Sequence, residues 1–520
     1  MQRRHIWLRE NWHLVAIAAI IALGIFNNIA YFYGPSWING SDNYIYFSQA
    51  GLLAHGQVKQ IGCTIVDCTN YLIFAGVAFF FLLFGEGLLS AALFGIFCFS
   101  ATIVIIYIIG RELHGKAAGV ISGLFYSVMP LVLSQSSNVG DDIPMMMLVS
   151  LGVMLAILAL KREKDMNRYL FMSGFVVAIN LLSVSEAAIG ILFLSAYLLS
   201  LVIYKRRRRL SIGFCFYAVG ICAALAVVIV IGIYEGGSPS FVMSVYSQNY
   251  NMYFSGTQPA MGSYIKDLFL NWKTDPVTLG SLAFGYFGYA VVVAGAYLAA
   301  IRFRKGTILA YWLLISILYL GFGSISFEKY IPVLYIGPRY ALMFIPPITL
   351  IVGIALAEVI RRAGRMKAPK KMAIQTASAA IGFLLVISAI ADARYIDYSQ
   401  LSATEPLMQI GSYINSQHAG AKVYMPYAVP LSYYVDSRHV PEMAQGYPFG
   451  SIGCETINSM DLSNGSFIVG NVTGYKSCSL SLVYSPVMES WLRNYTLFSN
   501  WGDNFYWYNV YEYSVGKNNT

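Results

Sequence analysis

The chain has 520 residues, of which 57% are hydrophobic and only 11% are charged, and its formal net charge is +9. This composition is too apolar for ordinary water-soluble domains. The apolar residues are gathered in runs of about 20, the length that crosses a ~30 Å hydrocarbon core as a helix. The sequence therefore predicts an α-helical polytopic membrane protein.

About eleven runs have this length. The region 71–85 is also apolar, but it is short, and acids and glycine flank it instead of basic anchors. We expect it to lie on the outer leaflet or dip into it, with a twelfth span as the alternative. The predicted spans are 12–33, 88–110, 117–135, 143–160, 169–184, 187–204, 211–234, 277–301, 307–326, 341–360 and 373–391.

Charge orients these spans, because short cytoplasmic loops collect Lys and Arg. If 71–85 does not cross and the N-terminus is cytoplasmic, every basic cluster falls inside, so the net charge is a topology signal and not a nucleic-acid footprint. All Asn-X-Ser/Thr sequons then fall outside. The clusters are 111–116, 161–168, 205–209, 302–305 and 361–371, and the sequons begin at Asn39, Asn464, Asn471, Asn494 and Asn518.

The predicted domains are a transmembrane domain, 1–391, with outer loops 34–87 and 235–276, and an outer soluble domain, 392–520. The first apolar run ends in aromatic residues without a small-residue cleavage site, so we expect it to remain as an anchor. The last 129 residues are polar and rich in Tyr, with short alternating segments that indicate a small α/β domain. Expected strands include 421–425, 432–435, 466–469 and 505–513.

Four cysteines fall in segments assigned to the outside. Cys63 and Cys68 lie in the first outer loop, and Cys454 and Cys478 lie in the C-terminal domain. Two outer pairs predict two disulfides in an oxidising compartment. Free thiols or a metal pair are the alternatives, but no His stands near either pair at zinc spacing.

The outer loop after the first run carries an acid at the membrane surface. Asp42 precedes Tyr44, Phe47, Ala50 and Leu53, whose helical spacing predicts an interfacial helix that begins near Asp42. A carboxylate held there can act as a general base on an acceptor hydroxyl. Capping of the helix is the alternative role, because Asp is a preferred N-cap residue.

The next outer loop holds two adjacent acids, Asp141 and Asp142, shortly before Pro144. They enter a helix at its positive end, where capping is ordinary. Two acids exceed what capping requires, so a site for a hydroxyl-rich acceptor or for a divalent cation is the other interpretation.

Arg339 follows Gly337-Pro338 in an outer loop that leads into a span. A guanidinium on the outer side runs against the positive-inside bias and usually has an anionic partner. A lipid phosphate suits the fixed fork of donors that Arg presents. Contact with bulk lipid headgroups is the alternative.

These residues resemble the GT-C membrane glycosyltransferases, which use polyprenyl-phosphate-linked sugars, and especially the protein mannosyltransferase and aminoarabinose transferase branch. The resemblance covers most of the chain, and the tail 423–440 is similar to the small outer domain common in these enzymes. It rests on the acid Asp42 after the first span, Tyr44, the pattern Ala50, Leu53 and Gly56, the membrane-dipping run 71–85, the acids Asp141 and Asp142, and Arg339-Tyr340 followed by Pro346.

The resemblance implies a GT-C fold of about eleven transmembrane helices with an outer-leaflet juxtamembrane helix, and an inverting sugar transfer. Asp42 matches the catalytic acid of the family, and Arg339 with Tyr340 would hold the leaving polyprenyl phosphate. His55 and Lys59 are further candidates for that phosphate, with a solvated interfacial face as the alternative. Many relatives have a second acid after the first, and this chain has Asn43 there instead.

The implied partners are the lipid bilayer, a polyprenyl-phosphate sugar donor and a glycan, protein or lipid acceptor, at the cell membrane or, in a eukaryote, the membrane of the endoplasmic reticulum. Residues 136–142 and 501–504 also resemble motifs of oligosaccharyltransferase catalytic subunits. The first-loop metal-binding pattern of those subunits is absent, so a monosaccharide donor and no required metal are expected. A lipid-linked-sugar flippase is the rival from another class, although the sequence shows no internal repeat.

The paired cysteines give a first prediction. Peptide mapping under non-reducing conditions should find Cys63 joined to Cys68 and Cys454 joined to Cys478, because both pairs are placed in an oxidising compartment. A pair recovered as free thiols would refute that disulfide.

Overall fold

The computed structural model describes most of the N-terminal half of the chain and separate segments of the rest. The chain divides into two units, which we call the helical unit, residues 1–32 with 46–393, and the sheet unit, residues 33–45 with 394–520. The described residues are 2–31, 41–57, 70–136, 138–183, 187–236, 238, 307–323, 342–365, 372, 376, 409–410, 412–417, 422–425, 440–443, 451–452, 467–472, 480–484 and 509–513.

Helices make up the described part of the helical unit, and one of them, α2, begins in residues assigned to the sheet unit. The helices are α1 (Gln2–Tyr31), α2 (Ser41–Ala54), α3 (Tyr71–Phe84), α4 (Leu88–His114), α5 (Lys116–Ser127), α6 (Pro130–Ser136), α7 (Asp142–Lys161), α8 (Met166–Ile179), α9 (Ala188–Lys205), α10 (Arg208–Gly236), α15 (Thr307–Phe322) and α16 (Ile345–Ala363), with 3₁₀ turns η4 (Glu163–Asp165) and η5 (Asn180–Leu182).

Six helices among the described residues are long and apolar enough to cross a membrane. Each overlaps a predicted span. The predicted spans 277–301 and 373–391 fall almost entirely outside the described residues. The helix α3 has 14 residues, about 21 Å at 1.5 Å per residue, and whether it crosses the membrane stays a prediction. The six are Glu10–Ile29, Leu88–His114, Asp142–Lys161, Ala188–Lys205, Arg208–Tyr234 and Leu342–Ala363.

Two predicted spans are not single helices. The region 117–135 is divided into α5 and α6 by a break at Val128 and Met129. Pro130 explains the break, because proline lacks a backbone N–H and disfavours helical geometry in the preceding residue. The region 169–184 is helical as α8 from Met166 and then tightens into η5 at Asn180.

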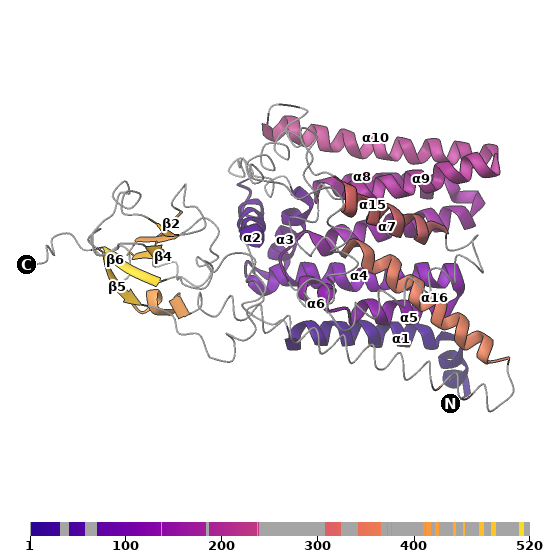
Figure 1. Cartoon of the computed structure of the whole chain (residues 1–520), viewed down its shortest axis with the longest axis horizontal. Coiled ribbons are helices and arrows are strands. Elements are labelled where there is room, and N and C mark those ends of the chain that lie inside the picture. The colour runs from indigo at the N-terminus through magenta and orange to yellow at the C-terminus, as the bar shows by residue number, and fades with distance from the viewer. Residues whose placement is uncertain are drawn as a thin grey trace, which may run out of the picture. The chain divides into compact units, whose positions relative to one another are not determined.

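Glycines bring the central helices close together. Helices α4, α5 and α16 contact one another, and α7 lies beside α4 (Figure 1). A side chain on Gly119 of α5 would collide with the carbonyl of Tyr107 in α4, and one on Gly353 of α16 would collide with Ser122 of α5. Small residues at helix contacts are what membrane bundles need, because lipid offers no hydrophobic drive for association.

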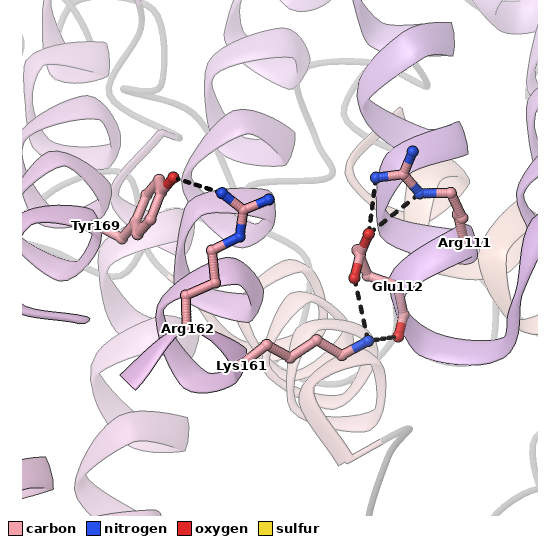
Figure 2. Close-up of polar contacts among 5 residues, drawn as sticks. All are labelled: Arg111, Glu112, Lys161, Arg162 and Tyr169. Atoms are coloured by element: carbon pink, nitrogen blue, oxygen red, sulfur yellow. Dashed lines mark hydrogen bonds and ion pairs between the residues drawn. The ribbon is translucent and has the colours of Figure 1, made fainter. Parts of the chain in front are cut away.

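One end of the bundle, which we call the basic end, gathers the last turns of α4, α7 and α16, the turn between α9 and α10, and the first residues of α8. Glu112 of α4 accepts hydrogen bonds from Arg111, at 2.8 and 3.1 Å, and forms an ion pair with Lys161 of α7 at 3.2 Å (Figure 2). Arg162, directly after α7, donates to the Tyr169 hydroxyl of α8 at 3.3 Å.

Two further glutamates are neutralised at the basic end. Glu358 of α16 is only 2% exposed; it accepts hydrogen bonds from Arg361 and Arg362 at 2.6 to 2.9 Å and lies 3.0 Å from His114 of α4. Glu163 lies 3.8 Å from Arg207 in the turn between α9 and α10 and 3.5 Å from Arg209 at the start of α10. Four predicted cytoplasmic clusters therefore lie on one face of the bundle, as the positive-inside argument requires; which face is cytoplasmic stays a prediction.

The described strands of the sheet unit form one mixed sheet in the order β2-β1-β4-β6-β5, with β3 paired to β4. Pairs among β1 to β4 are parallel, and β6 pairs antiparallel with β4 and β5. Expected strands at 421–425, 466–469 and 505–513 correspond to β1, β4 and β6, while 432–435 lies outside the described residues. The strands are β1 (Lys422–Met425), β2 (Val440–Met443), β3 (Ser451–Ile452), β4 (Phe467–Val472), β5 (Leu480–Tyr484) and β6 (Asn509–Tyr513).

The orientation can be tested by labelling. In sealed cells, a membrane-impermeant maleimide should label Ser41→Cys and Asn464→Cys but not Arg207→Cys, because Arg207 belongs to the basic end. After permeabilisation Arg207→Cys should label, since its side chain is 71% exposed. Labelling of Arg207→Cys in intact cells would show that the orientation is the reverse of the predicted one.

Candidate functional site

The end of the bundle opposite the basic end carries the acids of the second outer loop. Because α4 and α7 both finish at the basic end, the turn that precedes α7 lies at the other end of the bundle. This turn ends with Asp141 and Asp142, which are only 3% and 4% exposed. Carboxylates buried to this degree are costly unless hydrogen bonds support them, so they mark a candidate site.

Asp141 occupies the N-cap position of α7, but its side chain makes no capping hydrogen bond. Its Oδ2 accepts a hydrogen bond from the hydroxyl of Tyr46 in α2, at 3.3 Å and across 95 residues of sequence. The side chain therefore does not cap α7, and its role in a functional site stays a prediction. Asp142 lies in the first turn of α7, where the helix dipole favours an acid.

Asn70, directly before α3, extends this contact. Its Nδ2 donates to the Tyr46 hydroxyl at 2.6 Å, and both residues are buried, with 1% and 0% exposure. Three segments are thus joined by a chain of hydrogen bonds that runs from Asn70 through Tyr46 to Asp141. We call Tyr46, Asn70, Asn138, Asp141 and Asp142 the acidic centre.

Neighbouring helices hold the acidic turn in place. Gly95 of α4 leaves room for it, since an added Cβ would lie 2.5 Å from the carbonyl oxygen of Ser136 and 3.2 Å from that of Asn138. The Ser136 hydroxyl donates to Asn28 Oδ1 of α1 at 2.5 Å. Asn180 Nδ2 of η5 donates to the carbonyl of Met145, in the first turn of α7, at 3.1 Å.

Several buried oxygen atoms around the acidic centre have no hydrogen-bond partner in the described part of the chain. They are Gln49 Oε1, Asn138 Oδ1, Asn180 Oδ1 and Ser183 Oγ. Gln49 stands one helical turn after Tyr46, and Asn138 stands three residues before Asp141. Buried polar atoms are nearly always hydrogen-bonded, so these oxygens indicate that a ligand or water supplies donors here.

Most other predicted site residues fall where the structure does not describe them. Asp42 lies in α2, but its side chain is outside the described residues, as are Lys59, Arg339 and Tyr340. Their roles stay predictions.

His55, just after α2, is exposed. Its Nδ1 lies 2.8 Å from the Gly51 carbonyl and 3.7 Å from Glu86 Oε2. The structure therefore places His55 against a carboxylate of the α3–α4 turn, and a phosphate would have to compete with that contact.

The predicted disulfides, Cys63–Cys68 and Cys454–Cys478, also lie outside the described residues. The three cysteines that are described, Cys98, Cys215 and Cys222, are free and lie in α4 and α10. Among the residues that the structure describes, no three His, Cys, Asp or Glu side chains form a group that could hold a metal ion.

Sequence reasoning missed Tyr46 and Asn70. Tyr46 contacts Asp141 across 95 positions of sequence and Asn70 contacts Tyr46 across 24, and no local pattern connects them. The signal available in the sequence was the amide of Asn70 directly before the apolar run 71–85; in the structure it makes no side-chain capping hydrogen bond.

The fold is that of solved membrane glycosyltransferases. ArnT from Cupriavidus metallidurans, bound to undecaprenyl phosphate, matches with a TM-score of 0.59 and 14% identity over 96% of this chain and 98% of its own. The archaeal oligosaccharyltransferase AglB from Archaeoglobus fulgidus, in complex with an inhibitory peptide and a dolichol-phosphate, matches with a TM-score of 0.54 and 15% identity over 80% of this chain. The chain spans only 62% of the length of AglB.

The chain thus shares the fold of these membrane glycosyltransferases. In addition, residues 71–234, about a third of the chain, match the model of the dolichyl-phosphate-mannose-protein mannosyltransferase family. No curated protein has a matching sequence. The matched region holds α3 to α10 and so includes the acidic turn and the first residues of α7.

The packing at Gly95 can be tested on stability. Gly95→Ala should lower the free energy of unfolding by about 1–3 kcal/mol, because the methyl group must displace the Ser136–Asn138 backbone. Thermal unfolding of the purified protein in detergent would measure the change.

Gly87→Ala, at the start of the same helix, is the control. No described atom lies within 4 Å of its added Cβ, and its φ of 171° is extended backbone. We expect it to cost less than about 1 kcal/mol. Equal effects of the two substitutions would show that Gly95 does not position the turn.

Proposed function

We propose that the protein is an inverting glycosyltransferase that moves a sugar from a polyprenyl-phosphate donor to an acceptor on the non-cytoplasmic face of the membrane. The observation that carries the proposal is the structural match to ArnT over 96% of this chain, in a structure that holds undecaprenyl phosphate. AglB, with the same fold, is in complex with a dolichol-phosphate. The fold thus accommodates polyprenyl phosphates in two separate relatives.

In this mechanism Asp42 takes the proton of the acceptor hydroxyl as the oxygen attacks the anomeric carbon. The polyprenyl phosphate leaves from the opposite face of the sugar, which inverts the configuration. The position of Asp42 in the first turn of α2, four residues before Tyr46, supports this role. Because the next residue is Asn43, the assignment of the base rests on Asp42 alone.

Arg339 binds the phosphate of the donor, with Tyr340, His55 and Lys59 as additional candidates. A guanidinium presents two parallel donors to a phosphate, which fixes its orientation as well as its charge. The phosphate is anionic both in the bound donor and in the leaving group. Much of the contribution of Arg339 should therefore appear as donor affinity.

We prefer a monosaccharide donor over transfer of a complete oligosaccharide, because the first-loop metal-binding pattern of oligosaccharyltransferase catalytic subunits is absent from this sequence. We propose that Asp141 and Asp142 serve the acceptor. The proposed location is the cell membrane, with the N-terminus in the cytoplasm and the domain 392–520 outside.

Asp42→Asn tests the base. It should reduce transfer by about 10²- to 10⁴-fold, because Asn keeps the size and the capping oxygen but cannot take a proton. A residue that only caps a helix should tolerate the exchange at a cost below ~1 kcal/mol. The assay is transfer of radiolabelled sugar in nanodiscs, with a donor identified first by mass spectrometry of copurifying lipids.

Asp165→Asn, an exposed acid at the basic end, is the matched control and should retain wild-type turnover. Wild-type turnover by Asp42→Asn would instead overturn the assignment of the base.

Arg339→Ala tests the donor site in the same nanodiscs. We expect the Kd for the polyprenyl-phosphate donor to rise by about tenfold or more, since a hydrogen bond to a charged group contributes roughly 1.5–3 kcal/mol. An unchanged donor Kd would remove Arg339 from the phosphate site.

A further inference from the structure

Helices α9 and α10 lie side by side and are joined by a turn of consecutive cations (Figure 1). We call residues 205–209, which read Lys-Arg-Arg-Arg-Arg, the basic turn. All five residues are exposed. Among the residues that the structure describes, Glu163 is the only carboxylate within ion-pair distance of them, at 3.8 Å from Arg207 and 3.5 Å from Arg209. Exposed ion pairs contribute little, so the basic turn keeps most of its positive charge.

The backbone of the basic turn holds an arginine where glycine is the usual residue. Arg206 ends α9 in the left-handed conformation, with φ 48° and ψ 29°, and its N–H donates to the Val202 carbonyl at 3.0 Å. In the described part of the chain it is the only residue other than glycine with a positive φ. Glycine adopts this conformation without steric cost. The presence of arginine therefore indicates that its side chain has a role that the fold of the turn does not require.

Exposed apolar side chains continue from the basic turn along both helices. Ile203 and Tyr204 are exposed in the last turn of α9, and Ile212 and Phe216 are exposed one helical turn apart in α10. Both helices are long and apolar enough to cross a membrane, and α10 is the least buried of the six described helices of this kind. Such a surface faces acyl chains in a membrane protein. The basic turn therefore lies at the level of the lipid headgroups, a boundary at which Tyr is also enriched.

We propose that the basic turn binds the headgroup phosphates of anionic phospholipids in the adjacent leaflet. Guanidinium groups present paired donors that match phosphate oxygens, and Lys205, Arg206 and Arg208 have no ion-pair partner among the described residues. The exposed apolar side chains of α9 and α10 contact the acyl chains of the same lipids. A zwitterionic headgroup adds an ammonium group that the cations repel, so anionic lipids are selected. This binding depends neither on the proposed transferase function nor on which face of the membrane is cytoplasmic.

Native mass spectrometry of the delipidated full-length protein in detergent measures this binding. The probes are phosphatidylglycerol and phosphatidylcholine with the same acyl chains. We expect phosphatidylglycerol to bind at least about tenfold more tightly, because several cations act on one anionic headgroup. Equal affinities would overturn the proposal. Glycerol phosphate at the same concentration should not displace the bound lipid, since it has no acyl chains; displacement would show a site for soluble phosphates and would overturn the lipid as the ligand.

Arg206→Gly separates charge from folding. It removes one cation and supplies the residue that the left-handed backbone favours, so thermal stability should not fall. Phosphatidylglycerol affinity should fall about fivefold, which is the contribution of one cation near a membrane surface. Arg206→Lys keeps the charge and should keep most of the affinity. If Arg206→Gly retains the wild-type affinity, or loses it only together with thermal stability, the proposal is wrong.

Arg208→Gln and Arg365→Gln form a matched pair at the basic end. Arg208 begins α10 within the basic turn, whereas Arg365 is an exposed cation directly after the last turn of α16. Both substitutions lower the net charge by one. We expect Arg208→Gln to weaken phosphatidylglycerol binding about fivefold and Arg365→Gln to leave it unchanged. Equal losses would show that the lipid responds only to the overall charge of the protein, which would overturn the basic turn as its site.

Discussion

A carboxylate buried among apolar helices must be supported by hydrogen bonds or by opposite charge, and the two ends of this bundle meet that constraint differently. At the basic end, Glu358 is surrounded by Arg361, Arg362 and His114, so its charge is cancelled and its role is structural. At the acidic centre, Asp141 accepts a hydrogen bond from the hydroxyl of Tyr46, which α2 supplies from a distant part of the chain.

Helix α4 connects these two environments. Near its start, Gly95 lets the acidic turn pack directly on the helix backbone, and at its last turn Glu112 and His114 bind α7 and α16. The bonds at the basic end fix the rotation of α4 about its axis, and that rotation decides which face Gly95 presents to the turn. Ion pairs far from the proposed chemistry thereby help to define its geometry, as does the close contact of α4 with α5.

The class of protein follows from the sequence because hydropathy is a local property, and six predicted spans correspond to long apolar helices. At 117–135 hydropathy predicted one helix and was wrong, because a hydropathy average over a window does not register the helix break at Pro130. Asp141 and Asp142 could be recognised in the sequence as acids of an outer loop. The hydrogen-bond partner of Asp141 could not, because Tyr46 lies 95 residues away in the chain. The bond from Asn180 to the Met145 carbonyl likewise depends on the contact of η5 with α7, which no local pattern predicts.

The break between α5 and α6 also bears on how the chain enters the membrane. At 12 and 7 residues, the two helices are about 18 and 10 Å long, and neither spans a ~30 Å core alone. Near the break, the hydroxyls of Ser127, Ser134 and Ser136 donate to carbonyls three residues earlier in the chain, which satisfies backbone groups that lipid cannot. Neither of these short helices is a good independent substrate for the insertion machinery. During biosynthesis they should leave the translocon together with α4 and α7, so that the acidic turn is assembled within protein and is never exposed to lipid.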